Sequence, residues 1–308
     1  MGGGEDLERI AIRSEDGELE AEFVPGANML CCSLRHRGAE LLHAGHGLDA
    51  YERHGKTMGI PLLHPWANRL TGPRYAAAGK QVQLPAAGGR YATDPNGLPI
   101  HGALPGLMRW QPEAPSGGDR IRARLEWSSP PLLELFPFAH ELAFEAHAGS
   151  SRLTIETTLR ATGTDAVPVS FGYHPYLVVP GAHRQDWRVG LGAERRLILD
   201  EHMIPTGARE PIAQREFTLG DQSWDDGLDG LTSPPEFSVW GGDHRLAVTF
   251  DEGYAFAQVF APPGQDFICF EPMTAATDAL NSGDGLIVVA PGAEHGAAFT
   301  VTASSRWI

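Results

Sequence analysis

Cysteine is scarce in this 308-residue sequence, which has three: Cys31 and Cys32 are adjacent, and Cys269 lies far from both. An odd number without regular spacing argues against a disulfide framework and favours a reducing compartment. The start, MGGGEDLERI, has no apolar h-region, and no later apolar run approaches the ~20 residues that span a bilayer. We therefore expect a soluble, unexported, cytoplasmic protein without a membrane partner.

Positive charge is in short supply as well. There are 24 basic against 39 acidic side chains, giving a formal net charge of −15. Such a chain repels phosphate backbones and offers no basic stripe for them to follow. Nucleic acid is therefore not an expected partner.

The common short catalytic motifs are missing. There is no GxSxG for a serine hydrolase and no HExxH for a zinc enzyme. His64, His101 and His174 stand dozens of residues apart, with no cysteine pair beside them. The stretch GHGLDA (45–50) follows no predicted strand, so it does not predict a dinucleotide site. We expect neither a metal nor a cofactor.

Short β-strands dominate what is present. The 37 glycines and 24 prolines are spread without a fixed period, often in turn clusters such as PAAGGR and NSGDG. Between them, apolar and polar residues alternate, as in half-buried antiparallel strands, over five segments: 120–128, 140–148, 152–161, 245–250 and 297–304. No long amphipathic helix, repeat or linker interrupts them. The pattern predicts an all-β fold, a large antiparallel β-sandwich, with residues 1–308 as a single domain.

One histidine has a constrained backbone. In VSFGYHPYL (169–177), His174 precedes Pro175, whose ring forces the preceding residue into an extended conformation. We expect His174 at a strand end or bend, where its side-chain direction is fixed. A core histidine bonded to backbone is the alternative explanation.

Other polar residues interrupt apolar stretches. Glu271 lies between Phe270 and Pro272 in FICFEPMTAATDAL, where an ionised carboxylate is costly to bury unless it is paired or functional. His101 lies in LPIHGALPG, and Arg69 is the penultimate residue of GIPLLHPWANRL (59–70). Taken singly, each also fits a structural role, as a rim carboxylate, a turn histidine and a surface arginine.

Taken together, these stretches resemble the aldose 1-epimerase family, the galactose mutarotases. The family's order is kept from PGANMLCCSLRHRGAELL (25–42) through HPWANRL, IHG, FGYHPYL, SWDDGL (223–228) and QVFAPPGQDFICFEPMTAATDAL to VVAPGAEHGAAFTV (288–301). The resemblance implies a galactose mutarotase-like supersandwich whose open concave face binds a small-molecule aldose. It further implies that Glu271 is the catalytic base and His174 the general acid, and that the sugar-binding residues are Arg69, His101, Asp225, Asn68 and Gln258.

The chain departs from the family's pattern at two places. Only one glycine follows His101, before Ala103, and the stretch before Asn68 reads His-Pro-Trp-Ala instead of beginning with Gly-Arg. We therefore place it in a shorter, divergent branch. Asp225 and Asp226 are neighbours, and neighbouring side chains on a strand face opposite sides, so only one of them can enter the site. We choose Asp225 from the local sequence pattern alone.

The implied reaction interconverts the α and β anomers of an aldose. A carboxylate takes the proton of the anomeric hydroxyl, while an imidazolium, with an ordinary pKa near ~6.5, protonates the ring oxygen. The ring opens to the aldehyde, C1–C2 rotates, and closure exchanges the roles. We expect Glu271, His174, His101 and Arg69 to converge in one open cleft, with Glu271 and His174 on opposite sides of a space about one sugar ring wide.

Three alternatives stay open at the level of sequence. A hexose-6-phosphate 1-epimerase would need cations for the phosphate, for which Arg74 or Arg90 would serve. A non-catalytic sugar-binding or sensing module would rely on aromatic platforms such as Trp66 and Trp110. A glycosidase would pair two carboxylates, Glu271 and Asp225, but would leave the histidines without roles.

Overall fold

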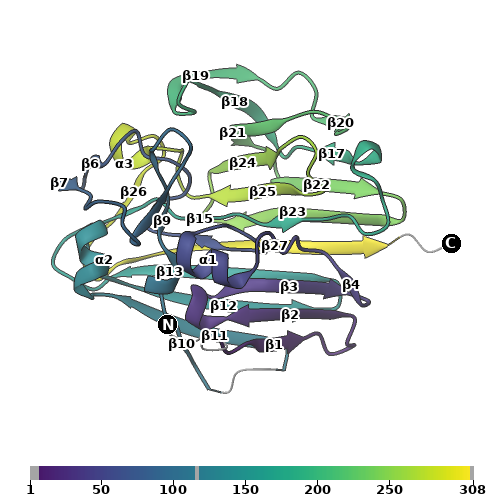
Figure 1. The fold of residues 1–308 in the computed structure, drawn as a ribbon, viewed down its shortest axis with the longest axis horizontal. Coiled ribbons are helices and arrows are strands. Elements are labelled where there is room, and N and C mark those ends of the chain that lie inside the picture. The colour runs from purple at the N-terminus through teal and green to yellow at the C-terminus, as the bar shows by residue number, and fades with distance from the viewer. Residues whose placement is uncertain (1–6, 115–117, 306–308) are drawn as a thin grey trace.

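The computed structural model describes residues 7–114 and 118–305, and antiparallel β-sheets dominate it (Figure 1). The widest sheet has nine strands, in the order β10 (Gln111–Pro112), β11 (Arg120–Trp127), β12 (His140–Gly149), β13 (Arg152–Ala161), β27 (Glu294–Ser305), β23 (His244–Glu252), β22 (Glu236–Gly241), β17 (Arg188–Gly190) and β20 (Glu216–Thr218).

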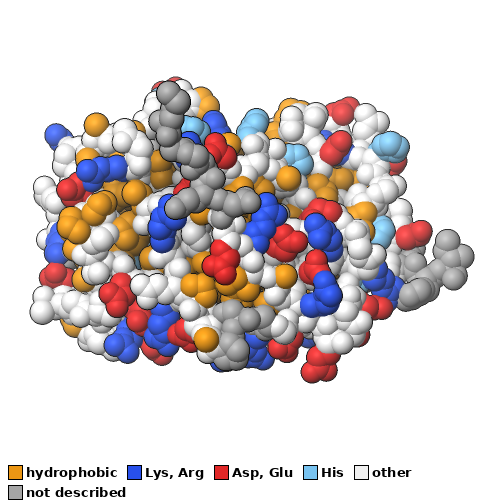
Figure 2. Space-filling view, turned by 60° about the horizontal axis from the view of Figure 1, so that its bottom comes forward, with side chains coloured by type: hydrophobic (Ala, Val, Ile, Leu, Met, Phe, Trp, Pro, Cys, Tyr) orange, Lys and Arg blue, Asp and Glu red, His pale blue; other side chains and the backbone are white. Residues whose placement is uncertain are grey.

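The five segments with alternating polarity form neighbouring strands of this sheet. They are β11, β12, β13, β27 and β23, so the prediction of strands there is confirmed. Buried and exposed residues alternate along all of β11, because one face packs on the core and the other meets water. The outer face carries ion pairs such as Arg122–Glu145 at 2.7 Å. Figure 2 shows acidic and basic side chains interspersed on one face of the molecule.

Two further sheets complete the sandwich. One has four strands: β1 (Ile10–Arg13), β2 (Leu19–Val24), β3 (Leu30–His36) and β4 (Ala39–Glu40). Strands β1 and β2 pack against β11 and β12. The other sheet has eight strands, of which seven follow the order β19 (Pro205–Pro211), β18 (Ala193–Leu199), β21 (Trp224–Leu231), β24 (Phe256–Ala261), β25 (Ile268–Met273), β15 (Gly172–Tyr173) and β5 (Leu62–Leu63). The eighth, β16 (Tyr176–Leu177), also pairs with β25.

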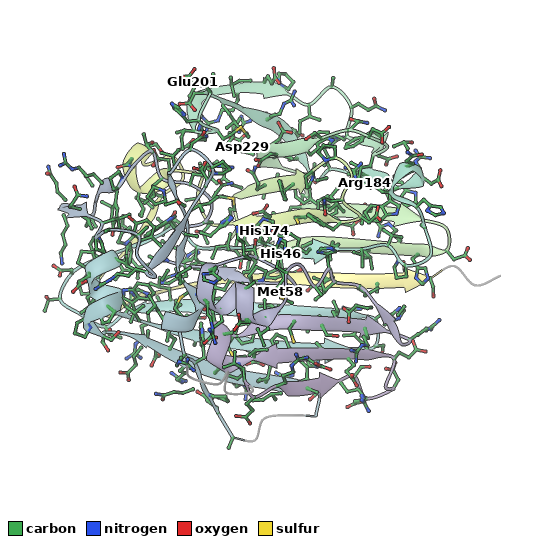
Figure 3. All side chains as sticks on the ribbon, in the orientation of Figure 1. His46, Met58, His174, Arg184, Glu201 and Asp229 are labelled. Atoms are coloured by element: carbon green, nitrogen blue, oxygen red, sulfur yellow. The ribbon has the colours of Figure 1, made fainter. Side chains whose placement is uncertain are left out.

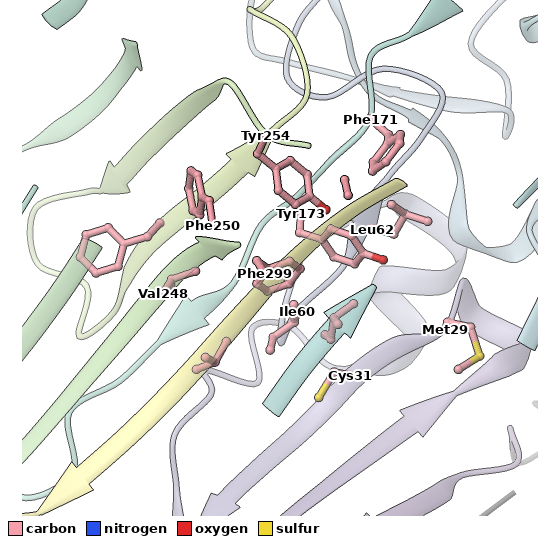
Figure 4. Close-up of a cluster of buried hydrophobic side chains, with 14 of the residues drawn as sticks. Met29, Cys31, Ile60, Leu62, Phe171, Tyr173, Val248, Phe250, Tyr254 and Phe299 are labelled. Atoms are coloured by element: carbon pink, nitrogen blue, oxygen red, sulfur yellow. The ribbon is translucent and has the colours of Figure 1, made fainter. Parts of the chain in front are cut away.

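A continuous apolar core joins the sheets. Figure 4 shows part of it, where Ile60, Phe171, Tyr173 and Phe299 pack together from different sheets and loops. Strand β25 is buried along its whole length because it lies against β22 of the nine-stranded sheet. A polar residue on β25 is therefore held in a low-dielectric environment.

Short elements surround the sheets. The helices are α1 (Leu48–His54), α2 (Pro130–Leu135) and α3 (Ala279–Ser282), and the 3₁₀ turns are Pro25–Ala27, Pro105–Leu107 and Arg184–Asp186. Small two-stranded ribbons are β6 (Arg74–Ala77) with β7 (Lys80–Gln83), β8 (Tyr91–Thr93) with β9 (Pro99–Ala103), and β14 (Val167–Val169) with β26 (Ile287–Val289). In the part of the chain that is described, no helix is long and apolar enough to cross a membrane.

A close backbone contact joins two of the polar stretches singled out in the sequence. The amide of Ala103 donates to the carbonyl of His64 at 2.9 Å, and that of His101 donates to Asn68 at 2.9 Å. Gly102 makes this approach possible: its φ is +74°, and a Cβ there would lie 2.1 Å from the carbonyl oxygen of His64. The glycine after His101 is therefore required by the packing of the two segments.

We expect Gly102→Ala to destabilise the protein by roughly 3–5 kcal/mol, because it combines backbone strain with a backbone clash. Gly97→Ala in the same β8–β9 ribbon is the matched control. Gly97 also has a positive φ, +80°, but open space around its Cβ position, so strain alone should cost about 1–2 kcal/mol. Urea unfolding midpoints measure both. Equal midpoints for the two variants would contradict the packing argument.

Candidate active site

The floor of the candidate site is one face of the eight-stranded sheet. Gln258 on β24 pairs with Glu271 on β25, and Asp225 on β21 pairs with Phe260 on β24. Side chains alternate along strands, so these four lie on the same face. Asp226 faces the other way and contacts Arg196 at 3.2 Å. The structure thus places Asp225, and not Asp226, on the face that carries Glu271.

A cleft of about 1010 Å³ opens above this floor. It brings together six of the seven residues proposed for the site from the sequence: Asn68, Arg69, His101, His174, Asp225 and Glu271. The seventh, Gln258, does not line the cleft. It is buried beneath Asp225 and donates to its Oδ1 at 2.6 Å, so it holds the carboxylate in place.

His174 lies between β15 and β16, at a strand end as expected. Its Nε2 is 3.3 Å from Oε1 of Glu271. The ring of Tyr176 stacks on the imidazole with centroids 4.4 Å apart and planes 4° apart, and its hydroxyl is 3.4 Å from Nε2. The hydroxyl of Tyr176 also contacts Oγ1 of Thr57 at 2.6 Å.

The expected spacing of Glu271 and His174 was wrong. The two side chains are in contact and do not flank a space the width of a sugar ring. The reason is topological: Tyr176 pairs with Cys269, which places His174 beside Glu271 along the same sheet.

The opposite wall holds a carboxylate–guanidinium network. Arg69 contacts Asp94 through Nε at 3.0 Å and Asp225 through Nη2 at 3.5 Å, and its Nη1 donates to Oδ1 of Asn68 at 3.0 Å. His101 stands between this network and His174, with ring centroids 5.5 Å apart. Both Asn68 and His101 have positive φ values, 56° and 63°, so their directions are set by the backbone contact between their segments.

Burial perturbs the titration of the groups on the floor. It raises the pKa of Glu271 well above its usual range, and the nearby Asp225 carboxylate adds to this while Arg69 opposes it. It lowers the pKa of His174 well below 6.5, with His101 adding to the effect. The buried imidazole of His174 therefore departs from the ordinary pKa on which the sequence argument drew. Burial, assisted by Arg69, lowers the pKa of His101 to about 3.

Burial thus favours the neutral form of both groups, a carboxyl beside an imidazole. A neutral carboxyl beside a neutral imidazole carries the same number of protons as a carboxylate beside an imidazolium, so the two forms interconvert by transfer between Oε1 and Nε2. Oε2 of Glu271, Nδ1 of His174 and Nδ1 of His101 are buried without a hydrogen-bond partner among the described residues. Unpaired buried polar atoms are costly, and a catalytic or binding role is one explanation for keeping them.

The residues named for the phosphate-epimerase and binding-module alternatives lie outside the cleft. Arg74 and Arg90 do not line the cleft, since Arg74 contacts Gln83 and Arg90 pairs with Glu134. Trp66 and Trp110 are 1% and 4% exposed and belong to the core, so neither is a platform for a sugar.

His64, a distant candidate metal ligand, is also buried away from the cleft. Its Nε2 is 2.9 Å from Nε2 of His140. Among residues 7–114 and 118–305, no group of three or more His, Cys, Asp or Glu side chains is arranged to hold a metal ion.

Other cleft residues were missed in the sequence. Asp94 anchors Arg69, but DPNG (94–97) indicated only a turn, and its Oδ1 does accept from the amides of Asn96 and Leu98. Tyr176 lay within the stretch around His174 without being assigned a role. No pattern pointed to the wall formed by the segment 43–57, whose cleft-lining residues are His43, Gly45, His46, His54, Gly55, Lys56 and Thr57.

Comparison with known proteins agrees with this architecture. The uncharacterized protein YihR of Escherichia coli (strain K12) is 24% identical over 257 residues, covering 79% of this chain and 80% of that protein. Galactose mutarotase of Mus musculus is 23% identical over 255 residues, covering 80% of this chain and 68% of that protein. The crystal structure of a galactose mutarotase-like protein from Clostridium acetobutylicum has a TM-score of 0.81 at 16% identity, covering 94% of each chain, which confirms the fold class.

Residues 11–302, nearly the whole chain, match the family described as aldose 1-epimerase. This match covers the strands that carry Glu271, Asp225 and Gln258, the loop of His174, and the paired segments of Arg69 and His101. The chain therefore belongs to the aldose 1-epimerase family.

Proposed function

We propose that the protein is an aldose 1-epimerase that interconverts the α and β anomers of an aldose by general acid–base catalysis. The observation that carries the proposal is the buried contact between Oε1 of Glu271 and Nε2 of His174 on the floor of a cleft. Family membership supports it independently.

The close contact suits the chemistry better than a wide separation. The anomeric hydroxyl and the ring oxygen are both bonded to C1, so a base and an acid that act on them together must also be neighbours. Glu271 as carboxylate takes the hydroxyl proton, and His174 as imidazolium gives a proton to the ring oxygen. The C1–O5 bond breaks, and the open-chain aldehyde faces a neutral carboxyl and a neutral imidazole.

Ring closure reverses these transfers. After rotation about C1–C2, the 5-hydroxyl attacks the other face of the aldehyde, gives its proton back to His174, and the new anomeric oxygen takes the proton of Glu271. The pair holds one proton throughout, so the cycle needs no net exchange with solvent. The remaining cleft residues would bind the other hydroxyls: Asn68 and Asp225 offer acceptors, Arg69 offers donors, and His101 offers its ring edge.

We expect Glu271→Gln to lower kcat by about 10²–10⁴, because the amide keeps the shape but cannot take the proton, while KM changes little. His174→Asn should act similarly. Exchange NMR on a freshly dissolved aldose, after subtraction of spontaneous mutarotation, measures both. Glu201→Gln is the matched control: Glu201 is at the molecule's edge, far from His174 in Figure 3, and 87% of its side chain is exposed. Wild-type rates in Glu271→Gln would show that the assigned base is wrong.

Arg69→Ala should raise KM about tenfold or more and also lower kcat, because it removes charged hydrogen bonds and leaves Asp94 and Asp225 without their shared cation. Arg196→Ala is the control. Arg196 contacts Asp226, the neighbour of Asp225 that faces the opposite side of β21, so KM should stay near the wild-type value. The role of Arg69 would be refuted by an unchanged KM in Arg69→Ala, measured by the same exchange NMR.

A further inference from the structure

The cleft has a second wall whose chemistry differs from that of the floor. The segment 43–57, which includes helix α1, turns His43, His46, His54 and Lys56 toward the cleft, with Thr57 beside them. Figure 3 labels His46 and His174, which both line the cleft. None of the residues that this segment contributes to the lining is acidic.

The acidic side chains of the same segment are engaged elsewhere. Asp49 pairs with Arg53 at 2.9 Å, and Glu52 pairs with Arg109 at 3.2 Å. Neither Asp49 nor Glu52 lines the cleft. The basic and imidazole groups of the wall therefore face the cleft without a carboxylate of their own segment beside them.

Lys56 is the cation of this wall. The chain contains two lysines, and the other, Lys80, forms an ion pair with Asp165 at 2.7 Å and donates to the carbonyl of Pro137 at 2.8 Å. Lys56 forms no ion pair with any described residue, although the protein carries a net charge of −15. An unpaired ammonium that lines a cleft in so acidic a protein is available to a ligand.

The wall adjoins the catalytic pair. Thr57, next to Lys56, contacts the hydroxyl of Tyr176, whose ring stacks on His174. His43 packs on Phe267 of the cleft with ring centroids 4.9 Å apart. A ligand held at Glu271 and His174 can thus extend along one continuous cleft to Lys56. The cleft's volume of about 1010 Å³ lies near the upper end of ordinary ligand pockets, and a single pyranose does not fill it.

We propose that the substrate is an aldose with an anionic group remote from C1, bound by Lys56 with hydrogen bonds from His46 and His54. This assignment rests on the epimerase function proposed above and names its substrate class. The floor cannot provide the anion site, because Arg69, its guanidinium, already contacts Asp94 and Asp225. Phosphate, carboxylate and sulfonate share the required chemistry: each carries negative charge and several acceptor oxygens for an ammonium and imidazole N–H groups.

The test compares glucose, glucose 6-phosphate and glucuronate by exchange NMR at constant ionic strength. We expect a higher kcat/KM for at least one of the anionic sugars than for glucose. Lys56→Met should lower the ratio of anionic to neutral kcat/KM about tenfold, the loss of one charged hydrogen-bonding group. Lys80→Met, which removes the ion-paired lysine, should leave the ratio unchanged. A phosphate site would favour the 6-phosphate, and a carboxylate site the uronate.

The outcomes separate this inference from the epimerase function. The anion site is refuted, while the epimerase stands, if kcat/KM for glucose equals or exceeds that for both anionic sugars. The same conclusion follows if Lys56→Met keeps the wild-type ratio of anionic to neutral kcat/KM. If no sugar is turned over, calorimetric titration decides: binding of an anionic sugar that Lys56→Met weakens supports the anion site and refutes the epimerase. If the anionic sugar binds equally well to wild type and to Lys56→Met, or if it does not bind at all, the anion site is refuted.

Discussion

The contact between Glu271 and His174 is the interaction on which the account of this protein depends. Each group alone would be expensive at this position: a buried carboxylate and a buried imidazolium both lose most of their hydration. Side by side, one proton held between them is enough to avoid an isolated charge on either group. The same burial that shifts their pKa values in opposite directions keeps a proton donor and a proton acceptor in adjacent positions, as the proposed reaction at an anomeric centre requires.

The scaffold fixes this contact through backbone geometry. The register of β24 against β25 sets Gln258 beside Glu271, and pairing of Tyr176 with Cys269 brings His174 to the same place. On the other side, Gly102 lets the segment of His101 approach that of Arg69. The polar side chains are therefore held by sheet pairing and by one close backbone approach, which leave them little freedom to rearrange.

Sequence patterns predicted the outer layer of the fold better than the layer that holds the site. Strand β11 alternates because one face meets water, and its neighbours do the same. Strand β25 is buried on both faces, so its sequence does not alternate between polar and apolar residues. Glu271 therefore stood out only as a charge among apolar residues. Asp225 and Asp226 are indistinguishable by composition, and only the register of β21 against β24 separates them.

Residues named for the alternative functions also turned out to have structural partners. Trp66 was named as a platform only for a non-catalytic sugar-binding module, and it lies in the core; large aromatics suit either place, and composition does not distinguish the two. Arg74 and Arg90 were candidates because they are cations, yet both have partners far along the chain or across a ribbon. Lys56 was not considered, because what distinguishes it is the lack of an ion pair, and sequence does not reveal partners.

The shared proton of Glu271 and His174 is tested most directly by NMR titration of both groups in the free protein, with ¹⁵N-labelled histidine and ¹³C-labelled glutamate assigned from His174→Asn and Glu271→Gln. Below pH 6.5 an ordinary imidazole gains a proton, whereas a lowered pKa delays that gain to more acidic pH. The account predicts that His174 shows no midpoint near 6.5 as the pH falls, and that the Glu271 carboxyl loses its proton well above pH 4.5. Ordinary midpoints, near 6.5 for His174 and near 4.5 for Glu271, would mean that the two groups titrate as independent, solvated side chains, and would contradict the account.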